Sequence, residues 1–188
     1  MSESNKETVV IIGKLFLISA VAALLLAVTY IPTQAQLEEN IIAAQKVILA
    51  NLVPGADNFD PVEGPANDAG EREVLYYRAV DGSGNIIAYA FFQQQQGSQS
   101  RIVVAGAVDS SFSNVLGMDV LSHEETPGLG AKITTPAFKD QFRGVPMEQL
   151  SLSRSGGSID AITGATVSSQ AVVSALNTKI NQIKAAEA

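Results

Sequence analysis

An unbroken apolar stretch dominates the start of the chain and predicts a membrane-spanning helix. Residues 9–31 read VVIIGKLFLISAVAALLLAVTYI, with Lys14 as their single charged side chain. The uncharged part, residues 15–31, covers about 25 Å at a rise of ~1.5 Å per residue. With the preceding residues, and with the Lys14 ammonium at the interface, the stretch is long enough to cross about 30 Å of hydrocarbon. We expect Tyr30 to lie at the interface and Pro32 to mark the exit.

A cleaved signal peptide is the competing interpretation of this stretch. Thr33-Gln34-Ala35 matches the small-x-small cleavage pattern only loosely, and the apolar run is longer than that of an ordinary signal peptide. We therefore expect a retained single-pass helix. Lys6 and Lys14 lie at its start, and the next basic residue is Lys46. The positive-inside rule then predicts a cytoplasmic tail at 1–8 and a main domain on the outer, periplasmic or extracellular, face of the membrane.

Helical spacing returns on both sides of a strand-rich middle. Residues 36–53 carry apolar side chains every three or four positions and end at Pro54-Gly55, which predicts a helix linking the anchor to a domain at 54–188. Residues 56–70 are rich in Pro, Gly, Asn and Asp and predict a loop or irregular wrap. From Val167 onward the helical spacing resumes, with apolar residues at Val172, Leu176, Ile180 and Ile183.

The middle of the chain predicts about four β-strands. The candidate strands share β-branched and apolar residues and are 74–80, 86–92, 102–108 and 115–121. Asp81-Gly82-Ser83-Gly84-Asn85 joins the first two as a hairpin, and the polar run 93–96 is a strand end or loop. Thr135 before Pro136 is typical of an N-cap and first helical residue, which predicts a short helix through Phe142. Without regular βαβ alternation, the pattern favours an α+β domain with a mainly antiparallel sheet and a few helices.

Composition excludes several classes of function. Among 188 residues, 46% are hydrophobic and mean hydropathy is +0.19, while 19 acidic residues outnumber 12 basic ones. Residues 1–31 carry equal numbers of acidic and basic side chains, so the net charge of −7 falls on the remainder. Phosphate contacts need clustered Lys and Arg, and no such cluster occurs, so we expect no nucleic-acid partner.

The absence of cysteine narrows the redox chemistry open to the chain. With no Cys and one His, disulfides, thiolate zinc sites, a cysteine nucleophile, covalent c-type haem and Cys-ligated iron–sulfur clusters are all excluded. If the protein carries out redox chemistry, an organic cofactor is the expected carrier.

Residues 158–166 place hydroxyl groups where a helix begins. A short alternating pattern at Ile159 and Ala161, with Ile162 beside it, predicts a strand that stops at Thr163-Gly164, and helical spacing follows. The free N–H groups and dipole of a helix N-terminus favour an anion, commonly a phosphate. The alternative is a strand–loop–helix corner with a threonine cap. The residues alone do not distinguish Thr163 from Thr166 as the functional hydroxyl.

A second segment, residues 123–132, has the composition of a tight ligand-facing turn. Pro127-Gly128 and Gly130 leave little side-chain bulk, so a flat ligand can approach the backbone, and Leu129 offers an apolar face. Its polar groups, including Thr126 and Lys132, would supply contacts. A solvated glycine-rich surface turn is the alternative.

Neither a metal site nor a hydrolase centre is expected in this chain. His123, Glu124 and Glu125 are adjacent in sequence, so their side chains point in different directions. The chain has many serines but no G-x-S-x-G motif, and only one histidine could serve as a base, so the sequence offers no convincing nucleophile–base–acid arrangement. We assign no catalytic residue and no metal ligand.

Two motifs together resemble a known family. Asp160-x-x-Thr163-Gly164-Ala165-Thr166 matches the D-x-x-[ST]-G-A-[ST] signature of covalent FMN-binding domains, and ETPGLG at 125–130, behind one N-terminal membrane helix, is also typical of them. Over essentially its full length the chain resembles the RnfG family, a component of the Rnf ion-translocating electron-transport complex. The NqrC family of the sodium-pumping NADH:quinone reductase is a longer relative and the second choice.

The resemblance implies a membrane-anchored flavoprotein that relays electrons through FMN joined to Thr166 by a phosphoester. A separate flavin transferase would make this bond from FAD and would recognise Asp160, Thr163, Gly164 and Ala165. The second segment would flank the isoalloxazine ring with Glu125, Thr126, Gly128, Leu129, Gly130 and Lys132. The implied partners are the membrane and redox subunits of an Rnf-type complex. A non-redox, membrane-anchored module that binds a phosphate ligand or a protein partner remains the alternative.

Overall fold

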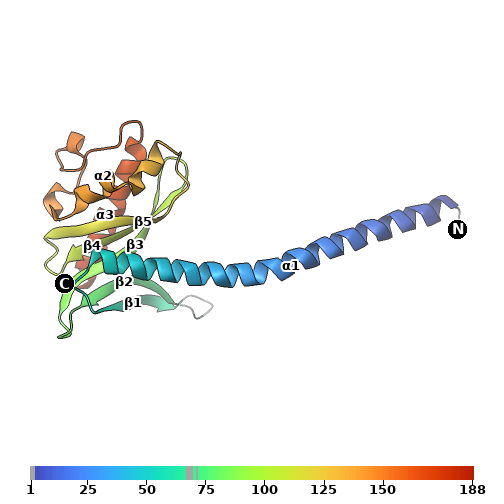
Figure 1. The fold of residues 1–188 in the computed structure, drawn as a ribbon, viewed down its shortest axis with the longest axis horizontal. Helices are drawn as coiled ribbons and strands as arrows, with labels where there is room; N and C mark the ends of the chain where they lie inside the picture. The colour runs from blue at the N-terminus through green and yellow to red at the C-terminus, as the bar shows by residue number, and fades with distance from the viewer. Residues whose placement is uncertain (1–2, 67–69, 71) are drawn as a thin grey trace. The chain divides into compact units, whose positions relative to one another are not determined.

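A long N-terminal helix and a sheet domain make up the described part of the chain (Figure 1). The fold is that of a computed structural model, which describes residues 3–66, 70 and 72–188. The chain divides into two compact units, Met1–Ala44 and Gln45–Ala188, and each is described by itself.

Helix α1, Glu3–Leu52, runs through the first unit and ends in the second. Its segment Glu7–Val28, with a mean hydropathy of 2.7, is long and apolar enough to cross a membrane. The helical segments predicted at 9–31 and 36–53 both belong to α1, which continues through position 32 instead of ending there. As predicted, the second of them stops just before Pro54-Gly55.

The second unit is built on a six-stranded antiparallel sheet whose spatial order equals the sequence order. The strands are β1 Asn58–Ala66, β2 Arg72–Val80, β3 Ile86–Gln96, β4 Arg101–Asp109, β5 Asn114–Ser122 and β6 Val145–Pro146. The predicted hairpin is confirmed, with Tyr77 opposite Ala90. The polar run 93–96 continues β3 and pairs with β4, so it is a strand end.

Strand β1 corrects the prediction of a loop at 56–70 for residues 58–66, and residues 67–69 lie outside the part of the chain that the structure describes. Prolines and glycines in this region suggested irregular chain, but β1 lies at the edge of the sheet and pairs only with β2. An edge strand tolerates proline because its outward N–H groups need no partner in the sheet. The pairing is irregular where the turn-forming residues occur, with register shifts between Val62 and Glu63 and between Glu63 and Ala66. With β1 and the short β6, the sheet has more strands than the four predicted.

Short helical turns connect the sheet to the last helix. They are η1 Gly130–Thr134, α2 Pro136–Lys139, η2 Asp140–Phe142, η3 Met147–Gln149 and η4 Ser153–Ser155. The predicted helix after Thr135 is therefore present as α2 and η2. Thr135 does occupy the N-cap position, but its hydroxyl donates to the Lys132 carbonyl instead of capping α2. Phe138 and Phe142 are buried edge to face, with ring centroids 5.3 Å apart.

Helix α3, Thr166–Ala186, packs across one face of the sheet. The helix face predicted from the spacing, Val172 to Ile183, is buried, and Leu176 contacts β4 at Gly106. A side chain at Gly106 would overlap Leu176 and would lie 2.7 Å from the Phe91 ring, so glycine allows the helix to approach the sheet. This face of the sheet, with α3, forms the larger core.

The opposite face carries a smaller, alanine-rich core. Side chains alternate along the strands, so Ala88 and Ala90 point away from α3 while Phe91 points toward it. Leu49, in the last turn of α1, and Val53, just after the helix, pack against these alanines. The last turn of α1 is therefore part of the sheet domain.

The C-terminal end of α3 is fixed to the sheet by the carboxylate of Glu187. It accepts hydrogen bonds from the Tyr76 hydroxyl at 2.5 Å and from the Tyr89 hydroxyl at 3.4 Å. Arg78 approaches it at 2.8 Å through Nη2 and at 2.9 Å through Nε. We call these four residues the Glu187 cluster.

Candidate functional site

The chain enters α3 through a tight turn, residues 162–166, which we call the helix-entry turn. The Ala165 N–H donates to the Ile162 carbonyl at 2.9 Å, and Gly164 has a φ of +79°. That left-handed conformation is one that glycine adopts without steric cost. The strand predicted before this turn is absent: residues 158–165 form a loop with a single parallel bridge between Ile159 and Leu152.

Neither threonine caps α3, which corrects the interpretation of a threonine-capped corner. The N-cap residue is Ala165, and α3 has no side-chain cap. The first helical N–H to bond backward is that of Ser169, to the Ala165 carbonyl at 3.0 Å. The N–H groups of Thr166, Val167 and Ser168 precede it and therefore have no acceptor within the helix. Such groups, at the positive end of the helix dipole, form a site suited to a phosphate.

Two side chains that sequence reasoning missed bind the backbone of the helix-entry turn and of Asp160, which precedes it. The Ser169 hydroxyl donates to the Ala165 carbonyl and accepts from the Ile162 N–H, each at 3.0 Å. The Gln141 side chain forms two hydrogen bonds with the backbone of Asp160. Its Oε1 accepts the Asp160 N–H at 2.7 Å, and its Nε2 donates to the Asp160 carbonyl at 3.4 Å. The Asp160 residue itself is exposed, as is Thr163.

The glycine-rich loop, residues 125–130, lies against the helix-entry turn. The N–H groups of Leu129 and Ala131 both donate to the Thr126 carbonyl at 3.2 Å, which closes the predicted tight turn. A Cβ atom added to Gly164 would lie 3.2 Å from Leu129 Cδ2. The two segments singled out in the sequence are therefore neighbours in the fold.

Two apolar side chains are exposed beside this contact. Leu129 is 45% exposed and Val167 is 59% exposed. Between residues 87 and 188, a range the structure describes in full, they are the large apolar residues exposed to solvent. A flat aromatic ligand anchored at the helix-entry turn would find apolar surface on both of them.

The Glu125 side chain, in contrast, faces the interior. Its Oε1 accepts the N–H groups of Gln99 at 2.9 Å and Ser100 at 3.2 Å, and its Oε2 accepts the Ser98 N–H at 3.3 Å and the Ser168 hydroxyl at 2.5 Å. Burial raises the pKa of Glu125, but these hydrogen bonds outweigh it and leave the pKa below its ordinary value. The carboxylate is thus held ionised by four donors from the protein.

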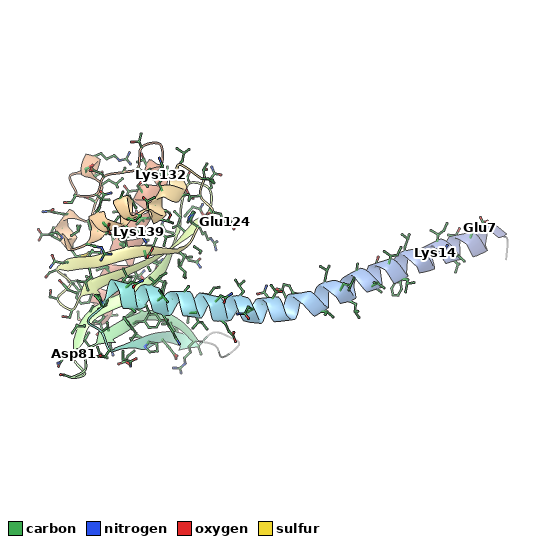
Figure 2. The ribbon with its side chains drawn as sticks, viewed as in Figure 1. Glu7, Lys14, Asp81, Glu124, Lys132 and Lys139 are labelled. Atoms are coloured by element: carbon green, nitrogen blue, oxygen red, sulfur yellow. The ribbon has the colours of Figure 1, made fainter. Side chains whose placement is uncertain are left out.

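Gly130 is also buried, whereas three other candidate residues in or near the loop lie outward. Thr126, Gly128 and Lys132 are exposed, and Figure 2 shows the Lys132 and Glu124 side chains at the surface of the domain. His123 accepts the Glu125 N–H at Nδ1, at 3.2 Å. Among the described residues, no group of three His, Cys, Asp or Glu side chains is arranged to hold a metal ion.

Comparison with known proteins identifies the family. A model of the FMN-binding domain matches residues 97–181, which include the glycine-rich loop and the helix-entry turn. The chain is 47% identical over 188 residues to the G subunit of the ion-translocating oxidoreductase complex of Methanosarcina acetivorans, covering 100% of both chains. The chain belongs to the RnfG family of ion-translocating oxidoreductase complexes. The resemblance noted in the sequence is confirmed.

Further relatives agree with this membership. The chain is 30% identical over 182 residues to the G subunit of the Na⁺-translocating ferredoxin:NAD⁺ oxidoreductase complex of Acetobacterium woodii, which covers 88% of this chain and 86% of the relative. A crystal structure of the C subunit of Na⁺-translocating NADH-quinone reductase from Parabacteroides distasonis matches with a TM-score of 0.50 at 22% identity, over 69% of this chain and 77% of that one. That last similarity concerns the fold alone.

Proposed function

We propose that this chain is the FMN-carrying electron-transfer subunit of an ion-translocating oxidoreductase complex, with the FMN joined to Thr166 by a phosphoester. Membership of the RnfG family and the FMN-binding domain support the flavin and the complex. The observation that supports attachment at this place is the start of α3, where a threonine side chain stands among N–H groups that lack helical acceptors.

The residues present fit a flavin phosphate. A phosphoester on Thr166 would lie among the N–H groups of the first turn of α3, which are donors for phosphate oxygens. Gly164 has no side chain to obstruct the approach, and Leu129 and Val167 offer exposed apolar surface for the ring. Thr163 stands on the turn before the helix, so the N–H groups of α3 favour Thr166 as the attachment site.

The attachment would be a transfer of FMN from FAD. In that step the Thr166 hydroxyl oxygen would bond to the phosphorus of the FMN half, the diphosphate bond to the adenosine half would break, and AMP would leave. The hydroxyl proton would pass to a base of the flavin transferase. Asp160, Thr163 and Gly164 are exposed, so the transferase can read them on the folded surface.

Once bound, FMN would supply the redox chemistry, because the flavin ring takes up and releases electrons. The protein then needs to position the ring, shield one face and present the other to a redox partner, so no general acid or base is required of the chain. The partners would be the membrane and redox subunits of an Rnf-type complex.

The ion path is assigned to those partners. The membrane-crossing segment Glu7–Val28 carries Lys14 and, at its boundary, Glu7, and an ion path needs several polar groups facing a protein interior. We place the short N-terminal tail in the cytoplasm and the sheet domain on the outer face, on the distribution of lysines around the anchor.

Flavin attachment is tested by in-gel fluorescence after denaturing electrophoresis and by intact mass, on full-length protein made together with a flavin transferase. The wild type should carry one FMN and Thr166→Ala should carry none. Thr166→Ser keeps the hydroxyl and is the matched control, so it should be modified. A wild-type chain without flavin, or a Thr166→Ala chain that retains it, would contradict the proposal. A non-covalent phosphate-binding module would give a wild type that loses all flavin on denaturation.

A further inference from the structure

The Glu125 carboxylate joins three segments that are distant in sequence. It lies at the start of the glycine-rich loop and binds the backbone of residues 98–100, which are 25 to 27 positions earlier. It also binds Ser168, which is 43 positions later and in the first turn of α3. The FMN-binding site proposed above lies where two of these segments meet.

The backbone around this carboxylate presents hydrogen-bond donors that suit its negative charge. Three successive N–H groups, those of Ser98, Gln99 and Ser100, point at its two oxygens. Successive N–H groups arranged in this way form a concave anion site. A Cβ atom added to Gly97 would lie 2.5 Å from Oε1, and one added to Gly130 would lie 2.6 Å from Oε2. The backbone therefore closes around the carboxylate at both glycines.

In this arrangement the Glu125 carboxylate is not available for direct contact with the flavin. Glu125 is 4% exposed, and both oxygens accept hydrogen bonds from the protein. The residues that Glu125 contacts, however, adjoin the helix-entry turn. Ser168 lies two residues after Thr166, and Gly130 follows Leu129, which contacts Gly164.

We propose that Glu125 is a positioning residue of the flavin site, which sets the first turn of α3 and the glycine-rich loop at the separation that Thr166 and the flavin ring require. It acts through Ser168 and Gly130 and does not touch the flavin. The inference rests on the proposed attachment of FMN at Thr166. Replacing the carboxylate by an amide would turn an –NH₂ group toward N–H donors, so the two segments would separate.

The test compares two Glu→Gln variants whose carboxylates bind near opposite ends of α3, in the full-length chain with flavin transferase. Glu125→Gln should slow FMN incorporation by about tenfold or more, since displacing a reacting group by about 1 Å can cost a hundredfold in rate. The flavin that does attach should show a changed visible circular dichroism and a shifted midpoint potential. Glu187→Gln removes a comparable hydrogen-bonded carboxylate from the Glu187 cluster and should leave incorporation rate, dichroism and potential as in the wild type.

Two results would overturn the inference. One is a Glu125→Gln chain that takes up FMN at the wild-type rate with an unchanged spectrum and potential. The other is an equal slowing of FMN incorporation in Glu187→Gln, because the effect would then come from a general loss of stability. A wild type without covalent FMN would instead refute the proposed function, so the two failures are separable.

Ser168→Ala provides a second, milder variant that keeps the Glu125 carboxylate in place. It removes one of the four donors to Glu125 and leaves the three N–H groups intact. It should slow incorporation about fivefold, the factor that corresponds to one hydrogen bond. If Glu125→Gln does not yield folded protein, Ser168→Ala decides the matter: an unchanged rate and flavin spectrum would overturn the inference.

Discussion

Gly164 combines two constraints in one residue of the helix-entry turn. Its φ is +79°, and an added Cβ atom would lie 3.2 Å from Leu129 Cδ2. A residue with a side chain costs about 1–2 kcal/mol in the left-handed conformation. The backbone and the contact with the glycine-rich loop therefore both favour glycine here.

We expect Gly164→Ala to lower the free energy of unfolding by about 1–2 kcal/mol and to slow FMN attachment, because Leu129 must move. Gly128→Ala is the matched control: its φ is +77°, but nothing lies within 4 Å of its added Cβ atom. Denaturant titration should show a similar loss of stability in both variants, and an attachment assay should show the stronger defect in Gly164→Ala. Equal attachment rates would mean that the contact with Leu129 has no role.

Individual residues show how much of the candidate site could be predicted from the sequence. Gly164 and Leu129 were identified because glycine-rich turns and helix starts have local signatures, and the fold places them in contact. Ser168 and Gln141 were missed because their partners are 43 and 19 positions away, and no local spacing reports such contacts. Glu125 was expected beside the flavin, yet its carboxylate binds the protein. A glutamate in a polar loop gives no local sign of being buried.

At the scale of elements, α3 is fastened to the sheet domain by a carboxylate at each end. Glu125 binds its first turn through Ser168, and Glu187 binds β2 and β3 just past its last turn. Burial raises the pKa of Glu187, but hydrogen bonds from Tyr76 and Arg78 and the charge of Arg78 outweigh it, so the pKa is lowered. The same surroundings raise the pKa of Tyr76 to about 12, chiefly through burial and then through Glu187.

The lowered pKa of Glu187 predicts a pH-dependent contribution to stability. The unfolded chain binds a proton more readily than the folded one, so the contribution is complete above the ordinary value of 4.5 and is lost as the pH falls through the lower folded pKa. Relative to wild type, Glu187→Gln should lose about 1–2 kcal/mol of unfolding free energy at neutral pH, allowing for the partly exposed Arg78. Urea titrations should show the difference shrinking below about pH 4.5, because protonated glutamate resembles glutamine. A difference that is constant with pH would contradict this.

The elements themselves were predictable where a period was sustained. About three turns of helical spacing, from Val172 to Ile183, identified α3, and runs of β-branched and apolar residues identified β2 to β5. The edge strand β1 was missed because Pro61 and Pro65 are tolerated only through its position in the sheet, which local sequence does not reveal. The opposite error occurred at 158–162, where buried Ile159 and half-buried Ala161 imitate strand alternation although they belong to a loop.

At the scale of the whole molecule, the sheet domain extends back into α1. The second compact unit begins at Gln45, and Leu49 and Val53 supply the apolar cover for the alanine-rich core. The boundary between anchor and domain therefore lies inside a continuous helix, where neither composition nor a helix break marks it.

Two truncations test this boundary. A chain of residues 45–188 should be monomeric without detergent and should accept FMN, because it retains both cores. A chain of residues 54–188 lacks Leu49 and Val53 and should be less stable by about 3 kcal/mol or more, at roughly 1.5–3 kcal/mol for each buried side chain. Thermal unfolding and size-exclusion chromatography measure both. Equal stability would show that the alanine-rich face needs no cover from α1.

The order of the strands has a consequence for when the flavin can be attached. Each strand pairs with its neighbour in sequence, so the sheet can form from contacts that close short loops. The contacts that fix α3 to the rest of the domain close long ones: Ser168 lies 43 positions after Glu125, and Glu187 lies 111 positions after Tyr76. Contacts between residues far apart in sequence form late, because the chain loses the entropy of loop closure before the contacts can stabilise it. Attachment of FMN at Thr166, as proposed above, would therefore follow the docking of α3, and a chain that carries FMN would already have this helix packed on its sheet.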